Sequence, residues 1–330
     1  MTKFIKTITI FLISISINAQ VNDSIFKEKA EKRLKAEFPS FRMINLEYIQ
    51  TGKSEFNSQL FDQDFQKGTL KNIKTVNLGV NLPIYIKKKL TVTSSLNYKF
   101  NEFEFSDIQN VATIPSFQQN DLVTFHNFST ALSATYFSTL FKKPIIYNTS
   151  IIADGNQEGF ERLKGLIGFS FILKKTARVT MTLGAIVFVD PTAQIPFFPT
   201  FTYNYKFKNS AWDFDFILPQ RILFRRQIAN KGRISIGSML NSNGFYVNID
   251  NPNFPAVAEY SQLEINSGLI YEHKLSNNFF ATFKGGVSNF VSSRLTEKAQ
   301  PNSEYFYQNE QSAKGYFNVG ISFNPTLKKK

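Results

Sequence analysis

Hydrophobic and polar side chains alternate along most of the chain with a period of two residues. In the clearest segment, 90–100, one face carries Leu90, Val92, Leu96, Tyr98 and Phe100, and the other carries Thr91, Thr93, Ser95, Asn97 and Lys99. Because successive side chains of a strand point to opposite faces, each face meets a different medium. Segments 75–84, 163–171, 179–187, 201–207 and 212–218 repeat the pattern. The alternation predicts an all-β fold.

Two kinds of connection alternate between these strands. Tight turns, most of them rich in lysine, fall at 87–89, 141–144, 174–175, 208–210, 229–232 and 275–278, and longer polar connections at 52–70, 106–121, 154–161, 190–196, 249–255 and 295–314. Short periplasmic turns and longer extracellular loops are typical of outer-membrane barrels. With a first strand near 42–51 and a last near 315–323, we expect an antiparallel up-and-down transmembrane β-barrel of about 14 strands, within a range of roughly 12–16.

Charge follows the same asymmetry. The tight turns hold lysines, whereas the long connections hold Asp62, Asp64, Asp107, Asp121, Asp154, Glu158, Asp190, Asp250, Glu304 and Glu310. The lysines either contact anionic lipid headgroups or only solvate the turns. The acidic loops suggest one hypothesis for function, a non-conducting structural or adhesive barrel that binds a partner at the cell surface.

The N-terminus has the layout of a secretory signal peptide. Lys3 and Lys6 precede an apolar stretch, 8–17, that closes on the small residue Ala19. That stretch is too short for a membrane-spanning helix, which needs about 20 apolar residues. We therefore expect residues 1–19 to be removed on export to the cell outer membrane.

The segment 20–40 departs from the two-residue alternation. Phe26, Ala30 and Leu34 recur every four residues among charged side chains. This spacing favours a short amphipathic helix on the periplasmic side, and a solvated leader is the alternative. Residues 41–330 are then the barrel domain.

Composition narrows the function classes. The chain has 36 Phe, 13 Tyr and one Trp, a mixture that suits strands with one apolar face, and it has no Cys. It can therefore form neither disulfides nor cysteine-ligated metal sites. A formal net charge of +13 is typical of nucleic-acid-binding proteins. Because the chain is exported and its lysines are spread over turns, we expect no nucleic-acid partner.

No constellation of catalytic residues is evident. The two histidines, His126 and His273, have no second ligand at a metal-binding spacing. Ser129 lies three residues from His126, so on one strand the two side chains would point to opposite faces and could not form an activating hydrogen bond. We expect no enzymatic activity, no cofactor and no metal.

The densest group of charged residues predicted to face the barrel lumen lies between 212 and 226. If the apolar residues of 212–218 face lipid, Asp213 and Asp215 face the lumen. A three-residue connection, 219–221, would place Asp215 opposite Arg225 and Asp213 opposite Gln227, and a two-residue connection would place Asp215 opposite Phe224. We expect the three-residue form. The lumen-lining candidates here are Asp213, Asp215, Arg221 and Arg225.

Other charged residues on predicted lumen faces are Lys99, Arg178, Glu264 and Lys284, together with Glu47, Lys164 and Glu272. They suggest two alternative interpretations of the barrel interior. One is a charge-selective constriction in a narrow pore or small-solute transport channel. The other is a network of ion pairs that fills the lumen and conducts nothing, and about 14 strands leave room for either.

The C-terminal strand resembles a known assembly signal. Asn318, Gly320 and Phe323 match the order polar, any, Gly, any, any, aromatic that the barrel-assembly machinery recognises, although the chain continues beyond Phe323 to Lys330. Together with Ala19, Gln20 and the bias to Lys, Asn, Phe and Ile, the chain resembles the uncharacterised outer-membrane β-barrel families of the Bacteroidota. The resemblance implies two kinds of partner, outer-membrane lipid and the assembly machinery.

Overall fold

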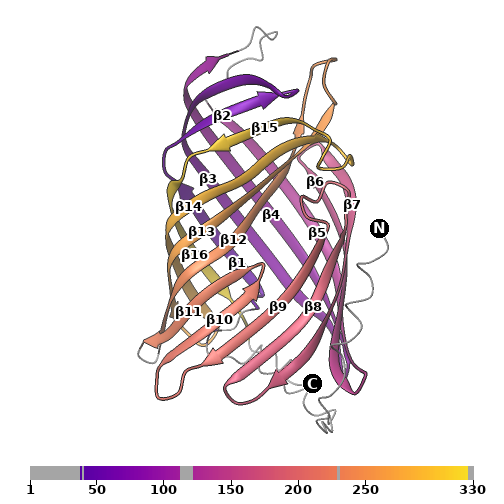
Figure 1. Cartoon of the computed structure of the whole chain (residues 1–330), viewed down its shortest axis with the longest axis vertical. Coiled ribbons are helices and arrows are strands. Elements are labelled where there is room, and N and C mark those ends of the chain that lie inside the picture. The colour runs from indigo at the N-terminus through magenta and orange to yellow at the C-terminus, as the bar shows by residue number, and fades with distance from the viewer. Residues whose placement is uncertain (1–37, 39–40, 112–121, 229–230, 326–330) are drawn as a thin grey trace, which may run out of the picture.

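The computed structural model describes residue 38 and residues 41–111, 122–228 and 231–325 (Figure 1). The predicted signal peptide and the predicted segment 20–40, apart from Phe38, lie outside the described residues. Within the described part of the chain, no helix is long and apolar enough to cross a membrane.

The described residues form one antiparallel sheet. Its strands are β1 (Ile44–Thr51), β2 (Ser54–Leu60), β3 (Gln63–Lys87), β4 (Leu90–Asn110), β5 (Leu122–Leu140), β6 (Lys143–Asn156), β7 (Gly159–Lys175), β8 (Val179–Val189), β9 (Phe197–Lys206), β10 (Trp212–Leu218), β11 (Arg221–Ile228), β12 (Gly232–Asn248), β13 (Val257–Lys274), β14 (Phe279–Glu297), β15 (Tyr305–Gln311) and β16 (Lys314–Phe323).

The sheet closes into a ring of fourteen wall strands. β1 and β2 pair with β3 in one continuous register, and β15 and β16 both pair with β14, so the sixteen segments count as 16 − 2 = 14 strands. β1 also pairs with β16, which joins the first strand to the last. The prediction of an all-β antiparallel barrel of about fourteen strands is confirmed.

The two faces of the wall differ as the alternation requires. Large apolar side chains of the outward face are exposed, among them Leu96 at 55%, Ile151 at 59% and Leu163 at 65%. Inward positions of the same strands carry Asn101, Asp154 and Lys164, which are buried or half-buried. An apolar belt around a polar interior is the surface expected of a barrel that faces hydrocarbon.

The two ends of the barrel differ in their connections. Five of the six predicted tight turns lie at one end, here called the turn end, together with residues 41–43 and the end of β16. The sixth, 229–232, includes residues 229–230, which lie outside the described residues; β11 ends and β12 begins on either side of them. At the opposite end, here called the loop end, three predicted long connections are wrong. Residues 295–314 contain the end of β14, the whole of β15 and the start of β16. Residues 52–70 consist mostly of β2 and the start of β3, joined by a two-residue turn with positive φ at Phe61 and Asp62, and residues 154–161 contain only a two-residue turn between β6 and β7.

The reason for these errors is that the alternation of apolar residues stops where the wall leaves the apolar belt. β2 carries Glu55, Asn57 and Gln59 on one face and Ser54, Phe56 and Ser58 on the other. A strand that stands in water needs no apolar outward face, so its polar residues were interpreted as a loop. The pair Phe61 and Asp62 also lacks the Asn-Gly signature of such turns.

One part of the ring is open at the loop end. β10 and β11 are only seven and eight residues long, and β11 pairs with β12 only as far as Met239 (Figure 1). β10 likewise pairs with β9 only from Phe201 to Lys206. Within the described strands, residues 241–248 of β12 therefore pair only with β13, and residues 197–200 of β9 only with β8. We call the junction between these two unpaired edges the seam.

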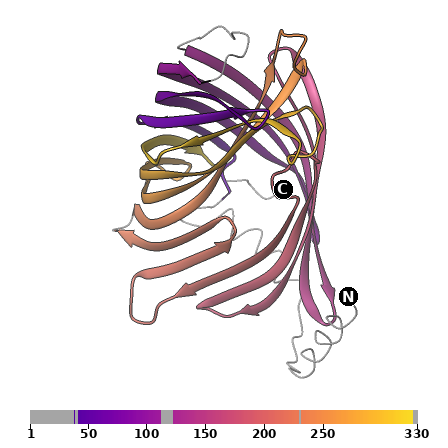
Figure 2. The same ribbon diagram turned by 45° about the horizontal axis from the view of Figure 1, so that its top comes forward.

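The strands on one side of the seam turn into the barrel. Phe245 of β12 stacks on Phe125 of β5, with 4.2 Å between ring centroids, and the hydroxyl of the next residue, Tyr246, donates to Asp154 of β6 at 2.6 Å. Neighbouring residues of a strand point to opposite faces, so both faces of β12 contact the inner wall. We call the end of β12 and β13, residues 241–264, the inserted hairpin. Its tip, orange in Figure 2, stands beside the pink strands of the wall.

A row of glycines crosses the sheet below the inserted hairpin. Gly237 of β12 lies opposite Gly268 of β13, which lies opposite Gly286 of β14. A Cβ atom on Gly268 would lie 2.1 Å from the carbonyl oxygen of Gly285, and one on Gly286 would lie 2.0 Å from that of Ser267. Only glycine permits backbones to approach this closely, as sharply coiled sheets require.

Candidate functional site: the barrel lumen

The lumen at the turn end holds the predicted charge cluster, with one correction. Asp215 is buried. It accepts a hydrogen bond from Arg221 Nε at 2.6 Å and forms an ion pair with Arg225. Three residues separate the last pair of β10 and β11, Ile217 and Arg221, but they are 218–220, so Asp213 lies opposite Arg225 and Asp215 opposite Leu223. The predicted register was wrong by two residues. A two-residue slip leaves every side chain on the same face, so the alternation could not detect it.

A second turn-end cluster joins the segment before β1 to the wall. Glu272 binds both Arg42, at 2.7 Å, and Arg233. Phe38 is buried beside them, under the guanidinium of Arg233 at 4.9 Å and 6.3 Å from the ring of Phe280. Glu47 and Lys284 form a further ion pair at 2.9 Å. The turn-end lumen thus carries a small excess of positive charge, from Arg42, Arg221, Arg225, Arg233 and Lys284 against Glu47, Asp213, Asp215 and Glu272.

The remaining predicted lumen residues lie apart from these clusters. Nζ of Lys99 donates to Asn243 of the inserted hairpin at 3.2 Å, across the interior. Glu264 pairs at 2.8 Å with Lys314, whose side chain is almost fully buried. Arg178 lies in the turn before β8 and is exposed to solvent. Asn318, Gly320 and Phe323, the residues of the predicted assembly signal, lie on β16, where Phe323 packs on Phe279.

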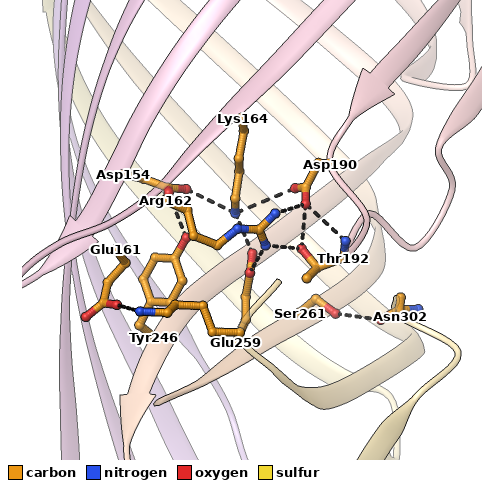
Figure 3. Close-up of polar contacts among 11 residues, drawn as sticks. Asp154, Glu161, Arg162, Lys164, Asp190, Thr192, Tyr246, Glu259, Ser261 and Asn302 are labelled. Carbon is orange, nitrogen blue, oxygen red and sulfur yellow. Dashed lines mark hydrogen bonds and ion pairs between the residues drawn. The ribbon is translucent and has the colours of Figure 1, made fainter. Parts of the chain in front are cut away.

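A buried ionic cluster fills the interior behind the seam (Figure 3). Arg162 of β7 binds Glu259 of β13 and, at 2.7 Å, Asp190 of the β8–β9 connection. Lys164 binds Glu259 and, at 3.1 Å, Asp154. We call this group the latch, because it joins the inserted hairpin to the opposite edge of the wall; its members are Asp154, Arg162, Lys164, Asp190, Tyr246 and Glu259.

Neutral hydrogen bonds extend the latch along the seam. Gln194 of the β8–β9 connection donates to Ser261 at 2.9 Å and accepts from Ser292 at 2.6 Å. At the tip of the hairpin, Asn156 donates to Asn248 at 3.0 Å. The seam is therefore closed by side chains, whereas other neighbouring wall strands are joined by backbone hydrogen bonds.

The carboxyl group of Asp190 has a lowered pKa. Burial alone would raise its pKa, but Lys164, a hydrogen bond from Thr192 and the guanidinium of Arg162 together hold the pKa of Asp190 below its ordinary value. Its side chain is 12% exposed, so solvent screens these interactions little. Asp190 is therefore ionised at neutral pH and available to the latch.

Aromatic rings close the lumen on the other face of the inserted hairpin. Phe245 and Tyr260 of the hairpin stack with 4.6 Å between centroids, and Phe103 of β4 lies 5.7 Å from Phe245. Phe56, Leu70 and Ile73 complete this buried cluster. The barrel interior therefore has two parts: a charged region at the turn end, here called the turn-end vestibule, and a region at the loop end where the inserted hairpin packs against the wall.

The sequence did not predict the latch as a unit. The sequence predicts Lys164 in the lumen and Asp154 and Asp190 in long loops. Asp154 lies on β6 instead, whereas Asp190 does lie in the β8–β9 connection but points inward; each of the two side chains is 12% exposed. A signal for the inserted hairpin was present in β12. Its outward row begins with Ile234 and Ile236 but continues as Ser242, Gly244 and Tyr246, which indicates that this face no longer meets lipid.

The histidines lie outside the lumen clusters. Nδ1 of His126 lies 2.9 Å from the hydroxyl of Tyr98, and His273 contacts Tyr271 in the same manner. Among the described residues, no group of three or more His, Cys, Asp or Glu side chains could hold a metal ion.

The closed antiparallel ring, its apolar belt and its charged interior define the architecture of a large outer-membrane-type β-barrel. Residues 15–324 match the family model described as a domain of unknown function, DUF6268. The chain belongs to this family. A search of curated proteins found no match.

Several solved barrels resemble the structure distantly. The COG4313 outer membrane channel from Pseudomonas putida F1 is 10% identical with a TM-score of 0.39, over 87% of this chain and 97% of that one. A Pseudomonas aeruginosa FadL homologue is 6% identical with a TM-score of 0.39, over 87% and 91%. The outer membrane protease OmpT from Escherichia coli is 7% identical with a TM-score of 0.29, over 86% and 96%.

Proposed function

We propose that the chain is a non-enzymatic outer-membrane channel for small solutes whose loop end is closed by the inserted hairpin and opens when the latch is released. The composition and signal layout support export to the outer membrane of a Gram-negative bacterium of the Bacteroidota. Outer-membrane lipid and the barrel-assembly machinery are its proposed partners. The seam is the observation that carries the proposal.

The seam differs physically from the rest of the wall. A strand within the ring cannot leave its neighbours without breaking a ladder of backbone hydrogen bonds, which is costly in a low-dielectric surrounding. The inserted hairpin has only side-chain contacts with β5, β6 and β7, through Phe245, Tyr246 and Glu259. The backbone hydrogen bonds that join the hairpin to the wall run to β14, where residues 258–264 pair with residues 290–297. Release of the contacts with β5, β6 and β7 therefore frees the β12 edge of the hairpin, which can move about the β13–β14 edge and open the loop end.

The turn-end vestibule supports conduction by its charge. Its inward side chains are paired but partly exposed, with Arg221 at 17%, Arg225 at 23% and Lys284 at 24%. Charged groups that line a water-accessible lumen select ions by sign. The small positive excess there favours anions over cations.

A reversible crosslink between β6 and the tip of the inserted hairpin, here called the seam variant, tests the proposal. The chain has no cysteine, so Asn156→Cys with Asn248→Cys gives one thiol pair that a short bis-methanethiosulfonate can join. Each thiol displaces methanesulfinate and forms a disulfide bond, which a reductant later cleaves. The matched control is Ser133→Cys with Ser150→Cys, on adjacent strands that are hydrogen-bonded throughout. Both variants are recorded as single channels in planar lipid bilayers.

We expect openings of the wild type and of the crosslinked control, and loss of openings in the crosslinked seam variant that reduction restores. Unchanged openings in the crosslinked seam variant would overturn the gate. A folded wild type with no conductance under any voltage or pH would overturn the channel.

A further inference from the structure

We infer that the aromatic cluster at the loop end contains a binding site for a small, uncharged aromatic molecule. A cavity of about 200 Å³ lies between the inserted hairpin and the wall. The cavity is partly open, so a ligand can enter it from outside the protein interior. Cavities of about 150 Å³ lined by apolar side chains stay dry and bind benzene-sized ligands.

The lining defines the chemistry of the ligand. Phe103, Phe105, Phe125 and Phe245 present rings to the cavity, and Val123 and Val247 complete its apolar wall. Ring pairs in the cluster include the stacked Phe125 and Phe245 and the edge-on Phe103 and Phe125. Aromatic rings prefer such offset and edge-on partners, so a further planar ring would find matching neighbours.

The side chains that line the cavity are uncharged, whereas the other lumen clusters contain ion pairs. No lining side chain carries a formal charge, and the polar groups of the lining come from Tyr260, Tyr307, Asn309 and Gln311. Burying an ionised group among phenylalanines is unfavourable without a partner, whereas one hydroxyl can reach an amide at the polar side. A monocyclic phenol therefore matches the cavity better than a benzoate or an ammonium compound.

The position of the site connects it to the gate. The wall strands β4 and β5 supply Phe103 and Phe125, and the inserted hairpin supplies Phe245 and Tyr260. A ligand that contacts both sides binds more tightly when the hairpin is in place, so it shifts the barrel toward the closed state. This coupling rests on the proposed channel function, whereas the binding itself does not.

Fluorine NMR with 4-fluorophenol tests the site directly. The probe is titrated into the full chain in lipid nanodiscs, and empty nanodiscs measure its partition into lipid. Val123→Trp fills the cavity, and the control Val287→Trp makes the same substitution at an outward position that is 46% exposed. Val247→Phe is a smaller filling variant, and heat-modifiable migration on a gel verifies that each variant is folded.

We expect saturable binding to the wild type and to Val287→Trp, weakened at least about tenfold in whichever filling variant folds. Absence of a saturable signal above empty nanodiscs, or equal binding by a folded filling variant, would overturn the site. Conductance is measured on the same preparations. Binding without conductance retains the site and removes the channel, and conductance without binding does the reverse.

Discussion

The turn end and the loop end of this barrel are built on different principles. At the turn end the wall is a complete ring of backbone hydrogen bonds, closed by β10 and β11 between β9 and β12. At the loop end the two edges of the same sheet meet at the seam and are held by the latch. Strands that are paired by backbone hydrogen bonds are difficult to separate, whereas contacts between side chains can break and form again. In the proposed channel, the part of the barrel that moves therefore lies where the solute would enter.

The coiling of the sheet at the glycine row offers the strongest test of this contrast. Gly268→Ala would place a methyl group 2.1 Å from the carbonyl oxygen of Gly285, so the backbones of β13 and β14 would have to separate. We expect loss of the folded barrel, measured by heat-modifiable migration and by refolding yield in detergent. Gly285→Ala is the control, because its nearest neighbour would be the oxygen of Tyr316 at 3.7 Å, an ordinary contact. Equal folding of the two variants would contradict the role of the row.

Removing the central anion of the latch should loosen the loop end and leave the turn end intact. Glu259→Gln leaves Arg162 and Lys164 with only Asp154 and Asp190 as acidic partners. Breaking a buried pair costs about 3–5 kcal/mol, and the remaining acids should limit the loss to the lower value. We expect faster amide hydrogen exchange in residues 241–264 and more frequent channel openings.

Glu47→Gln is the matched control for this prediction. It removes the acid of a single ion pair, with Lys284, within the hydrogen-bonded ring. Exchange in residues 241–264 should not change. If both variants loosen the hairpin equally, the latch has no special part in holding it.

The residues of the latch also show which features the sequence could predict and which it could not. Alternation between Leu90 and Phe100 predicted strands, facing and strand number, because the apolar belt imposes a period of two on every strand that crosses it. It could not predict that Asp154 and Asp190 turn inward, because no belt constrains residues at the loop end. It also missed the pairing of Glu259 with Arg162, 97 residues away, since no local pattern encodes such a contact.

Acid should open the seam before it affects the ring. In the folded barrel the pKa of Asp190 is below its ordinary value. The ionised carboxylate therefore stabilises the latch fully at any pH above that ordinary pKa, and this stabilisation is lost as the pH falls through the lower pKa of the folded state. We expect openings to increase only below about pH 4, in bilayer recordings at stepped pH. In Asp190→Asn the openings should be frequent already at neutral pH and depend less on acid.

The smallest expected effect concerns ion selectivity at the turn end. A pair of variants there distinguishes the effect of charges inside the lumen from the effect of charges in the turns. Arg225 faces the interior beside Asp215, whereas Arg178 is exposed in the β7–β8 turn. Removing a charge inside a narrow lumen changes the local potential, while bulk water and salt screen one outside it. We expect Arg225→Gln to reduce the anion preference about twofold, measured by reversal potential in a salt gradient, and Arg178→Gln to leave it unchanged. A shift of similar size in both variants would mean that selectivity is set at the rim, and the turn-end vestibule would then have no selective role.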